Sequence, residues 1–272
     1  MKRSERLAVI EKKLLDSPNK IYSLKGFCKE FNAAKSTISE DISILKNVFN
    51  KYQLGIIETS RGSQGGVKLI PYIKDEDVVK LQNQLIERLK DPARLLGGGF
   101  IYTSDLMFDS HLVGRIATVF TRKFQDKGAT MVATLETKGI PLAVMTAYLM
   151  NLPLVVIRRE AKISEGSTVS INYFSGSYDR IQKMSISKRS VTPGSKAIVI
   201  DDFMRGGGSV KGIEEILGEF EIEVLSSGIV IVSQDPEKKV VKNYVPLIIM
   251  KQDSDDRQKY SFFPNSLIFS TK

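Results

Sequence analysis

The stretch VIDDFMRGGGSV, residues 199–210, decides most about the fold and the chemistry of this chain. Its apolar, β-branched start is typical of a buried strand, and two adjacent carboxylates, Asp201 and Asp202, follow at once. Three glycines come next, and a helical pattern begins near Ser209. The order of strand, loop and helix predicts that the acids lie in a loop at the carboxyl end of a strand, where α/β sheets bind ligands.

The residue types in this loop indicate a ligand that carries both phosphate and hydroxyl groups. Glycines at 206–208 let the backbone approach an anion closely, and the first N–H groups of the helix point toward it. The acid pair distinguishes the loop from the dinucleotide-binding fingerprint, and the absence of Gly-Lys-Ser/Thr distinguishes it from a Walker A loop. Two carboxylates beside a phosphate cradle suit a phosphorylated sugar with vicinal hydroxyls. The alternative is a glycine-rich turn beside a solvated acid pair.

Strand and helix patterns alternate along the chain on both sides of this stretch. The expected helices cover residues 111–127, 141–150 and 209–220. The expected strands cover residues 131–135, 153–158, 167–174, 180–188, 196–201, 225–233 and 245–250. The strands at 167–174 and 180–188 read as a hairpin. Such alternation predicts an α/β domain with a central, mostly parallel sheet.

The first 73 residues have a different pattern, that of a small DNA-binding domain. Apolar residues at helical spacing predict helices over residues 4–16 and 24–31. The apolar stripe of a third helix consists of Ile38, Ile42, Leu45 and Phe49. Residues 55–73 then contain two short strand patterns around a Gly/Ser/Arg tip, which indicates a hairpin. Three helices followed by a hairpin predict an N-terminal winged helix-turn-helix.

The third helix presents polar side chains away from its apolar stripe, and Thr37 and Glu40 match a capping box at its start. Short polar and basic side chains on such a helix reach phosphates and base edges in a major groove. The candidate DNA contacts are Lys35, Ser36, Thr37, Ser39, Glu40, Ser43, Lys46 and Asn47 on the helix, and Arg61 and Gln64 at the hairpin tip. The alternatives are a helical domain with a merely solvated face and a helix-turn-helix that contacts protein.

The distribution of charge favours a nucleic-acid partner for this domain. The chain has 40 Lys and Arg residues against 31 Asp and Glu residues, a formal net charge of +9. Residues 1–73 hold 13 of the basic and 7 of the acidic residues, so most of the excess lies in the N-terminal part. A basic protein without such a partner is the simpler alternative.

The length of 272 residues suits about two domains. We expect a winged-helix domain over residues 1–73, a connector helix over 74–96 and an effector domain over 97–272. The boundary is placed in the connector because DPARLLGGGF, residues 91–100, breaks the helical pattern with a proline and three glycines.

Cysteine and histidine usage excludes two classes of site. One cysteine, Cys28, cannot form an internal disulfide, and one histidine, His111, cannot build a Cys/His metal cluster. The stretch of residues 140–157 carries no charge, but Pro141 and Pro153 divide it into a helix and a strand rather than a membrane span. We therefore expect a soluble, cytoplasmic protein with no membrane partner and no metal site of its own.

The stretch VIDDFMRGGGS resembles the phosphoribosyl pyrophosphate (PRPP) motif of type I phosphoribosyltransferases. LETKGIP, residues 135–141, is similar to that family's pyrophosphate loop, and IRREAKISEGSTVSINY, residues 157–173, to the strand and flexible loop that follow. The resemblance implies that the acids bind the ribose hydroxyls, the second often through a metal or water, and that the glycines wrap the 5′-phosphate. It assigns PRPP contacts to Asp201, Asp202, Phe203, Met204, Arg205, Gly206, Gly207, Gly208, Ser209, Thr137, Lys138, Gly139, Arg158, Arg159 and Lys162.

With the winged helix included, the chain resembles the PRPP-responsive purine operon regulators of low-GC Gram-positive bacteria. The resemblance implies a homodimer that binds double-stranded operator DNA, most simply as a repressor, and senses PRPP, with or without Mg²⁺, without catalysing transfer. An active purine phosphoribosyltransferase with an appended nucleic-acid-binding module is the alternative, although Gly206 and Ser209 replace the threonines of the enzymes' phosphate loop. A third possibility is a sensor of a guanine nucleotide or alarmone in the same pocket.

Overall fold

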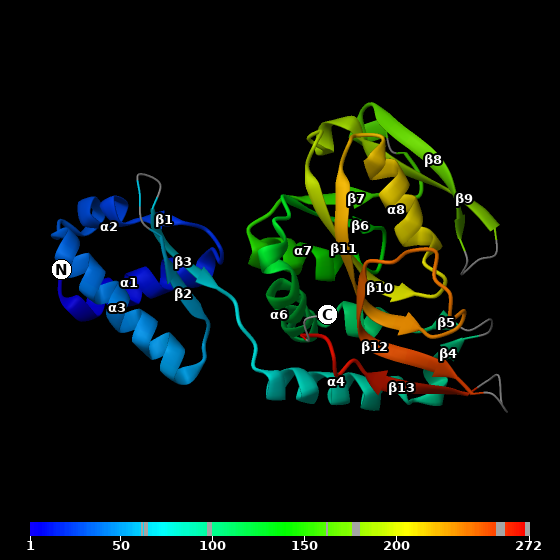
Figure 1. The fold of residues 1–272 in the computed structure, drawn as a ribbon, viewed down its shortest axis with the longest axis horizontal. Helices are drawn as coiled ribbons and strands as arrows, with labels where there is room; N and C mark the ends of the chain where they lie inside the picture. Colours follow the sequence, from blue (N-terminus) through cyan, green and yellow to red (C-terminus); the bar gives the residue numbers. More distant parts are fainter. Residues whose placement is uncertain are drawn as a thin grey trace. The chain divides into compact units, whose positions relative to one another are not determined.

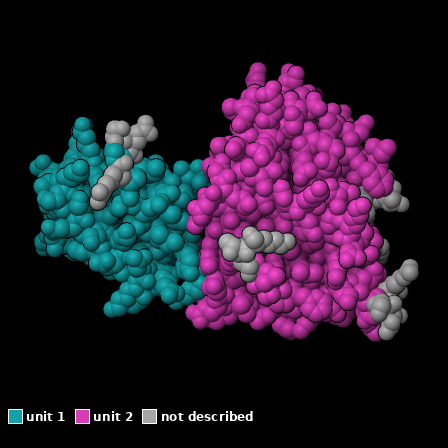
Figure 2. Space-filling view, viewed as in Figure 1, with its two compact units in different colours: residues 1–74, 148–151 teal, residues 75–147, 152–272 magenta. Residues whose placement is uncertain are grey.

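The computed structural model describes residues 1–60, 62, 65–96, 100–161, 163–175, 180–253 and 259–269. The chain forms two compact units, one of residues 1–74 with 148–151 and one of residues 75–147 with 152–272 (Figure 2). Three of the candidate binding residues, Arg61, Gln64 and Lys162, lie outside the described residues.

The N-terminal unit contains three helices and a small antiparallel sheet. The helices are α1 (Arg3–Asp16), α2 (Leu24–Phe31) and α3 (Lys35–Tyr52) (Figure 1). The strands, in their order across the sheet, are β1 (Tyr22–Ser23), β3 (Gly66–Ile70) and β2 (Ile56–Thr59). The predicted apolar stripe of α3 is buried in the core of this unit. This order of elements confirms the predicted winged helix-turn-helix.

The turn between α2 and α3 corrects one detail of the sequence analysis. Asn32 ends α2 in the left-handed conformation, with φ of 47°, which asparagine adopts more readily than most residues. Helix α3 then begins directly after its N-cap residue, Ala34. The backbone of Ala34 is extended, and no side chain makes a capping hydrogen bond there. The predicted capping box is wrong, because Thr37 lies inside the first turn and Glu40 pairs with Arg3 at 2.7 Å instead.

A buried ion pair that the sequence analysis missed joins α1 to α3. The carboxylate of Asp41 is fully buried, and Arg6 donates to it from Nε at 2.7 Å and from Nη2 at 3.3 Å. Two parallel hydrogen bonds satisfy both oxygens of a carboxylate that has no access to water. Asp41 therefore belongs to the packed side of α3, not to its polar face.

The C-terminal unit is built on a six-stranded sheet with the order β13-β12-β11-β10-β6-β7 (Figure 1). The strands are β6 (Met131–Leu135), β7 (Leu154–Ile157), β10 (Lys196–Met204), β11 (Glu223–Ser233), β12 (Tyr244–Gln252) and β13 (Tyr260–Pro264). Only β13 runs antiparallel to its neighbour, so the predicted mostly parallel α/β sheet is confirmed. The sequence analysis missed β13, a short edge strand in which only Phe262 is buried.

Helices cover both faces of this sheet. Helix α8 (Gly208–Gly218) packs on β10 and β11, and its Ile213 shares a core with Val199. On the other face, a Cβ at Gly228 of β11 would lie 2.9 Å from Phe120 of α6 (Ser110–Phe124) and 3.0 Å from Ile200. Strand β10 therefore has a helix on each side, which explains why it is apolar up to the acid pair.

The remaining elements lie around this framework. They are α4 (Asp75–Leu89), the short hairpin of β4 (Leu95–Leu96) and β5 (Phe100–Ile101), α5 (Ser104–Met107), α7 (Ile140–Met150), and the hairpin of β8 (Thr168–Ser175) and β9 (Arg180–Ser187). Helix α4 packs against β12, β13 and α6, and the β8–β9 hairpin packs against α8. In the described parts of the chain, every helix is too short or too polar to cross a membrane.

Candidate functional site

The strand order places a crevice at the acid pair. The chain passes from β6 outward to β7 and then returns to place β10 on the other side of β6. In open α/β sheets, ligands bind at such a reversal, outside the carboxyl ends of the two strands. Here those ends lead into residues 136–139 after β6 and into the glycine loop after β10.

A pocket of about 280 Å³ lies at this point. Seven predicted contacts line it, namely Thr137, Lys138, Arg159, Asp201, Asp202, Phe203 and Ser209. Four further lining residues were not predicted, namely Phe100, Ile101, Leu135 and Glu136. Segments that are far apart in the sequence thus meet around the acid pair, as the resemblance implied.

The acid pair itself lies inside β10, not in a loop as expected. Pairing between β10 and β11 continues through Met204, three residues beyond the predicted end of the strand. Asp201 is therefore buried, and its Oδ1 accepts a hydrogen bond of 2.9 Å from the backbone N–H of Asp202. Burial, and then the nearby charge of Asp202, raise the pKa of Asp201 well above its usual range. The two acids are consequently unequal: both line the pocket, and Asp202 is the more exposed of them.

Asp202 has a partner that the sequence did not suggest. Thr103, which is almost completely buried, donates a hydrogen bond of 3.0 Å from Oγ1 to Oδ2 of Asp202. The ammonium group of Lys138 lies 3.5 Å from the same Oγ1. A threonine hydroxyl thus contacts both the carboxylate of Asp202 and the ammonium group of Lys138. Nothing in the periodicity around Thr103 distinguishes it from other loop residues.

The glycine loop has the backbone geometry that the sequence predicted. Gly207 has φ of 92° and precedes α8, and a Cβ there would lie 2.9 Å from Val241. Only glycine meets both requirements at low cost. The first N–H groups of α8 have no partner inside the helix and are available to an anion. The hollow inside the loop measures about 20 Å³, so it holds about one water and a phosphate would require it to widen.

The other residues assigned by the resemblance differ in their surroundings. Met204 packs in the core with Val210 and Val241, whereas Arg205 lines a separate open hollow of about 700 Å³. Glu136 accepts hydrogen bonds from Nη1 of Arg158 at 3.2 Å and from the backbone N–H of Arg159 at 2.7 Å. Glu136 therefore fixes the strand end that carries both arginines beside the pocket.

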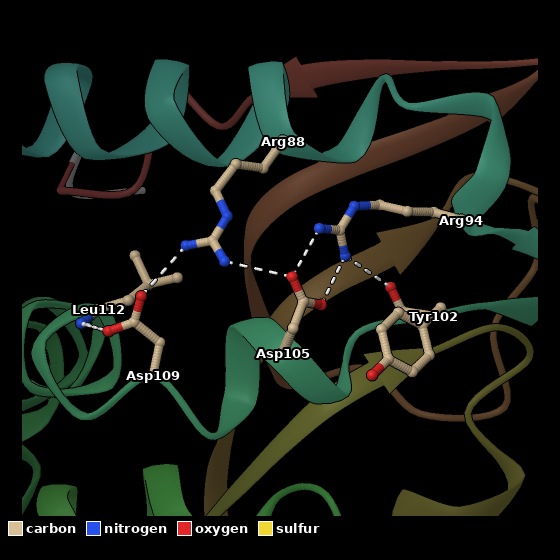
Figure 3. Close-up of polar contacts among 6 residues, drawn as sticks. All are labelled: Arg88, Arg94, Tyr102, Asp105, Asp109 and Leu112. Carbon is tan, nitrogen blue, oxygen red and sulfur yellow. Dashed lines mark hydrogen bonds and ion pairs between the residues drawn. The ribbon is translucent and has the colours of Figure 1, made fainter.

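A second charged cluster lies next to the pocket and joins α4 to the segment that contains Thr103 (Figure 3). Arg94 donates to both oxygens of Asp105 at 2.6 Å and to the carbonyl of Tyr102 at 3.1 Å. Arg88 of α4 donates to Asp105 and to Asp109, each at 3.2 Å. The pKa of Asp105 is lowered to about 2, and the hydrogen bond from Arg94 is the largest cause.

The N-terminal unit displays the predicted DNA-contact face. The side chains of Lys35, Ser36, Ser39, Glu40, Ser43, Lys46 and Asn47 are exposed on α3, and that of Thr37 is half-buried. They lie off the buried stripe, as a recognition helix requires. Glu40 forms an ion pair with Arg3, so its charge is partly matched within the unit.

The combination of these two units has close relatives. Residues 2–71 match the family described as "Bacterial purine repressor, N-terminal", and residues 110–260 match "Phosphoribosyl transferase domain". The purine biosynthesis transcriptional repressor PurR of Bacillus subtilis is 37% identical over 96% of this chain and 93% of its own length. This chain belongs to the family of bacterial purine biosynthesis transcriptional regulators.

Other relatives of the regulator help to separate its possible roles. The purine biosynthesis transcriptional activator PurR of Lactococcus lactis is 36% identical over 91% of this chain and 92% of its own. A xanthine phosphoribosyltransferase of Limosilactobacillus reuteri is 30% identical but covers 54% of this chain, and 80% of the enzyme is matched. The relatives that match most of the chain are thus named regulators, which favours a regulator over an enzyme.

A solved structure supports the fold of the C-terminal unit. The adenine phosphoribosyltransferase of Thermoanaerobacter pseudethanolicus superposes with a TM-score of 0.53 at 18% identity, covering 62% of the regulator and 98% of the enzyme. The likeness at this identity concerns the fold alone. The predicted type I phosphoribosyltransferase fold is thereby confirmed.

Gly139 of the regulator offers a sharp test of how the acid pair is held. A Cβ at this position would lie 2.7 Å from Oγ1 of Thr134, 3.0 Å from Oδ1 of Asp201 and 3.3 Å from the Cα of Asp201. We expect Gly139→Ala to lower the free energy of unfolding by about 1–3 kcal/mol, because the strand cannot move away without breaking its pairing. Urea unfolding should measure this loss of free energy.

The matched control is Gly114→Ala in α6, where a Cβ meets nothing within 4 Å and stability should rise slightly. Equal effects of the two variants would contradict the packing argument.

The charged cluster at Asp105 predicts a pH dependence of stability. Its pKa is depressed from 3.8 to about 2, so its stabilisation is present above pH 4 and is lost as the pH falls toward 2. The side chain is 34% exposed, so solvent screening leaves a contribution of about 1 kcal/mol at neutral pH. Urea unfolding of wild type and Asp105→Asn should differ by that amount at pH 7. A difference that persists undiminished at pH 2 would exclude this ion pair as its source.

Proposed function

We propose that this regulator binds operator DNA through α3 and the adjacent hairpin, and that its C-terminal unit binds PRPP as an effector without turning it over. The observation that carries the proposal is the half-exposed Asp202, which lines a pocket at the sheet's reversal point together with Lys138. The same chain has the N-terminal domain of a purine repressor. PRPP is a chemically sensible signal for purine synthesis genes, because it accumulates when purines are short.

The pocket supplies a suitable group for each part of PRPP. Asp202 would accept hydrogen bonds from the ribose hydroxyls, and the buried Asp201 would support it from behind. Lys138 and Arg159 would supply positive charge to the diphosphate. The backbone N–H groups at 207–209 would bind the 5′-phosphate once the loop widens.

Magnesium fits this site only as a companion of the ligand. Among the described residues there is no group of three or more His, Cys, Asp or Glu side chains that could hold a metal ion. Mg²⁺ commonly binds one or two carboxylates and completes its shell with substrate phosphates and water. Asp202 could serve as that carboxylate when a diphosphate is present, and the ion would then neutralise part of the ligand's charge.

We further propose that the regulator acts in the cytoplasm as a repressor whose operator affinity falls when PRPP binds. A homodimer is expected, because operators commonly present two half-sites one helical turn apart. Both roles occur among relatives, which are named a repressor in Bacillus subtilis and an activator in Lactococcus lactis. The chain is 37% identical to the repressor and 36% identical to the activator, a difference too small to separate the two roles. The direction in which PRPP changes operator affinity distinguishes a repressor from an activator.

Binding and turnover should be measured on the same sample. Calorimetry with PRPP and Mg²⁺ is expected to show saturable binding, and assays with adenine, guanine, hypoxanthine and xanthine are expected to show no nucleotide formed. The relative that is a xanthine phosphoribosyltransferase makes xanthine the strictest case. Nucleotide formation at enzymatic rates would contradict the proposed sensor and would support an active phosphoribosyltransferase.

A guanine nucleotide or alarmone is the second candidate ligand, because it carries a ribose and phosphates of the same chemistry. Competition calorimetry separates the two ligands. A guanine nucleotide that binds more tightly than PRPP and changes operator affinity by itself would make it the effector.

A further inference from the structure

We propose that Thr103 is the positioning residue that holds Asp202 and Lys138 ready for the ligand and that links the pocket to α4 through the charged cluster at Asp105. This inference rests on the proposed function, since it concerns the same pocket. It adds a residue that does not belong to any of the three motifs from which the pocket was predicted.

The first argument is the way in which Thr103 uses its hydroxyl. Thr103 is the N-cap residue of α5, and an N-cap threonine normally accepts a hydrogen bond from the backbone of its own helix. Here no such side-chain bond is made, and the hydroxyl is donated to Asp202 at 3.0 Å. The residue is 1% exposed, so water does not compete for the hydroxyl. The hydroxyl of Thr103 is therefore bonded to a residue of the ligand pocket and not to the first turn of α5.

The second argument is the pair of charges that this hydroxyl joins. It donates to Asp202 and lies within reach of the ammonium group of Lys138, at 3.5 Å. A hydroxyl can donate one hydrogen bond and accept others, so it can bridge a carboxylate and a cation. Without it, Asp202 and Lys138 would be free to approach each other directly. Thr103 thus keeps apart two groups that must contact different parts of PRPP.

The third argument is the rigid support on the other side of Thr103. Arg94 holds the carbonyl of Tyr102 directly before it and the carboxylate of Asp105 two residues after it (Figure 3). Arg88 then joins Asp105 to α4. Any shift of Thr103 on ligand binding must therefore strain or reorganise this cluster.

Helix α4 is well placed to carry such a shift onward. Its first residue, Asp75, directly follows Lys74, the last residue of the long segment of the N-terminal unit. The helix is fixed to the sheet by Gln82, which is buried and donates to the carbonyls of Leu247 and Asn265 at 3.0 and 3.1 Å. A change at Arg88 therefore reaches the C-terminal end of the DNA-binding segment, residues 1–74, through one continuous, anchored helix.

The test compares Thr103→Val with Thr103→Ser, which removes and keeps the hydroxyl, respectively. PRPP affinity by calorimetry should fall about tenfold or more in the valine variant, as for loss of one hydrogen bond to a charged group, and should stay within about twofold of wild type in the serine variant. The ratio of operator affinities without and with saturating PRPP should shrink only in the valine variant. Thr146→Val is the matched control, because it removes another buried hydroxyl, one bonded within α7 to Leu142, and should change neither quantity.

Asp105→Asn tests transmission separately and remains informative if the valine variant fails to fold. It should keep PRPP affinity within about threefold of wild type while reducing the operator ratio, because it weakens the pairs with Arg88 and Arg94 but leaves the hydroxyl of Thr103 and its bond to Asp202 in place. Wild-type PRPP affinity in Thr103→Val, or an undiminished operator ratio in Asp105→Asn, overturns the inference and leaves the proposed function standing. Absence of PRPP binding to the wild type overturns the proposed function first, and the inference with it.

Discussion

Asp202→Asn should lower the affinity for PRPP by about 100-fold or more. The carboxylate lines the pocket and is more exposed than that of Asp201, and two hydrogen bonds from ribose hydroxyls to a charged group contribute about 1.5–3 kcal/mol each. An amide keeps the shape of the side chain but loses the charge and one acceptor. Calorimetric titration with PRPP and Mg²⁺ measures the effect directly.

Two controls accompany this prediction. Asp126→Asn removes an exposed carboxylate in the same unit and should leave PRPP affinity unchanged. Asp201→Asn should cause a smaller loss than Asp202→Asn, because burial already favours the neutral form of Asp201. PRPP affinity within threefold of wild type in Asp202→Asn would remove the acid pair from the ligand site.

The triple variant Lys35→Ala, Ser39→Ala and Lys46→Ala should weaken operator binding by about 100- to 1,000-fold at moderate salt. All three side chains are exposed on α3 and away from its buried stripe, so their removal leaves the core of the unit intact. Loss of two lysine–phosphate contacts should also reduce the slope of log affinity against log salt by about 2. Titration of a labelled operator duplex at several salt concentrations gives both numbers.

The matched control removes the same number of charges from the other unit. Lys127→Ala with Lys188→Ala replaces two exposed lysines that lie outside the predicted DNA-contact face, so the net charge changes equally. Its operator affinity and salt slope should stay close to those of the wild type. Equal losses in the two variants would mean that α3 acts only through net charge, and an unchanged triple variant would refute the recognition helix.

Most of the framework was predictable from local sequence pattern. The buried stripe of α3 and the alternation of strands and helices follow from the periodicity of apolar residues. That periodicity can be read within each segment without knowledge of its tertiary contacts. The acid pair was predictable because it comes at the end of an apolar run, and parallel strands end at one edge of a sheet. Lys138 and Arg158 were assigned by the resemblance to the phosphoribosyltransferases.

The features that were missed depend on contacts between distant segments. Thr103 meets Asp202 across 99 positions of the chain, and Arg6 meets Asp41 across 35, and neither pair leaves a periodic signal. The acid pair was expected in a loop because strand propensity ends at an aspartate, whereas pairing with β11 extends β10 to Met204. Tertiary pairing here overrides local propensity, and it makes Asp201 a buried residue rather than a solvated one.

The central claim, that PRPP bound in the C-terminal unit controls operator binding in the N-terminal unit, is tested most directly by one titration. Operator affinity should be measured at constant ionic strength with and without saturating PRPP, for the wild type and for Asp202→Asn. The account predicts that PRPP weakens wild-type operator binding by about 5- to 150-fold and leaves Asp202→Asn unchanged. Identical wild-type curves, or an equal shift in Asp202→Asn, would contradict it.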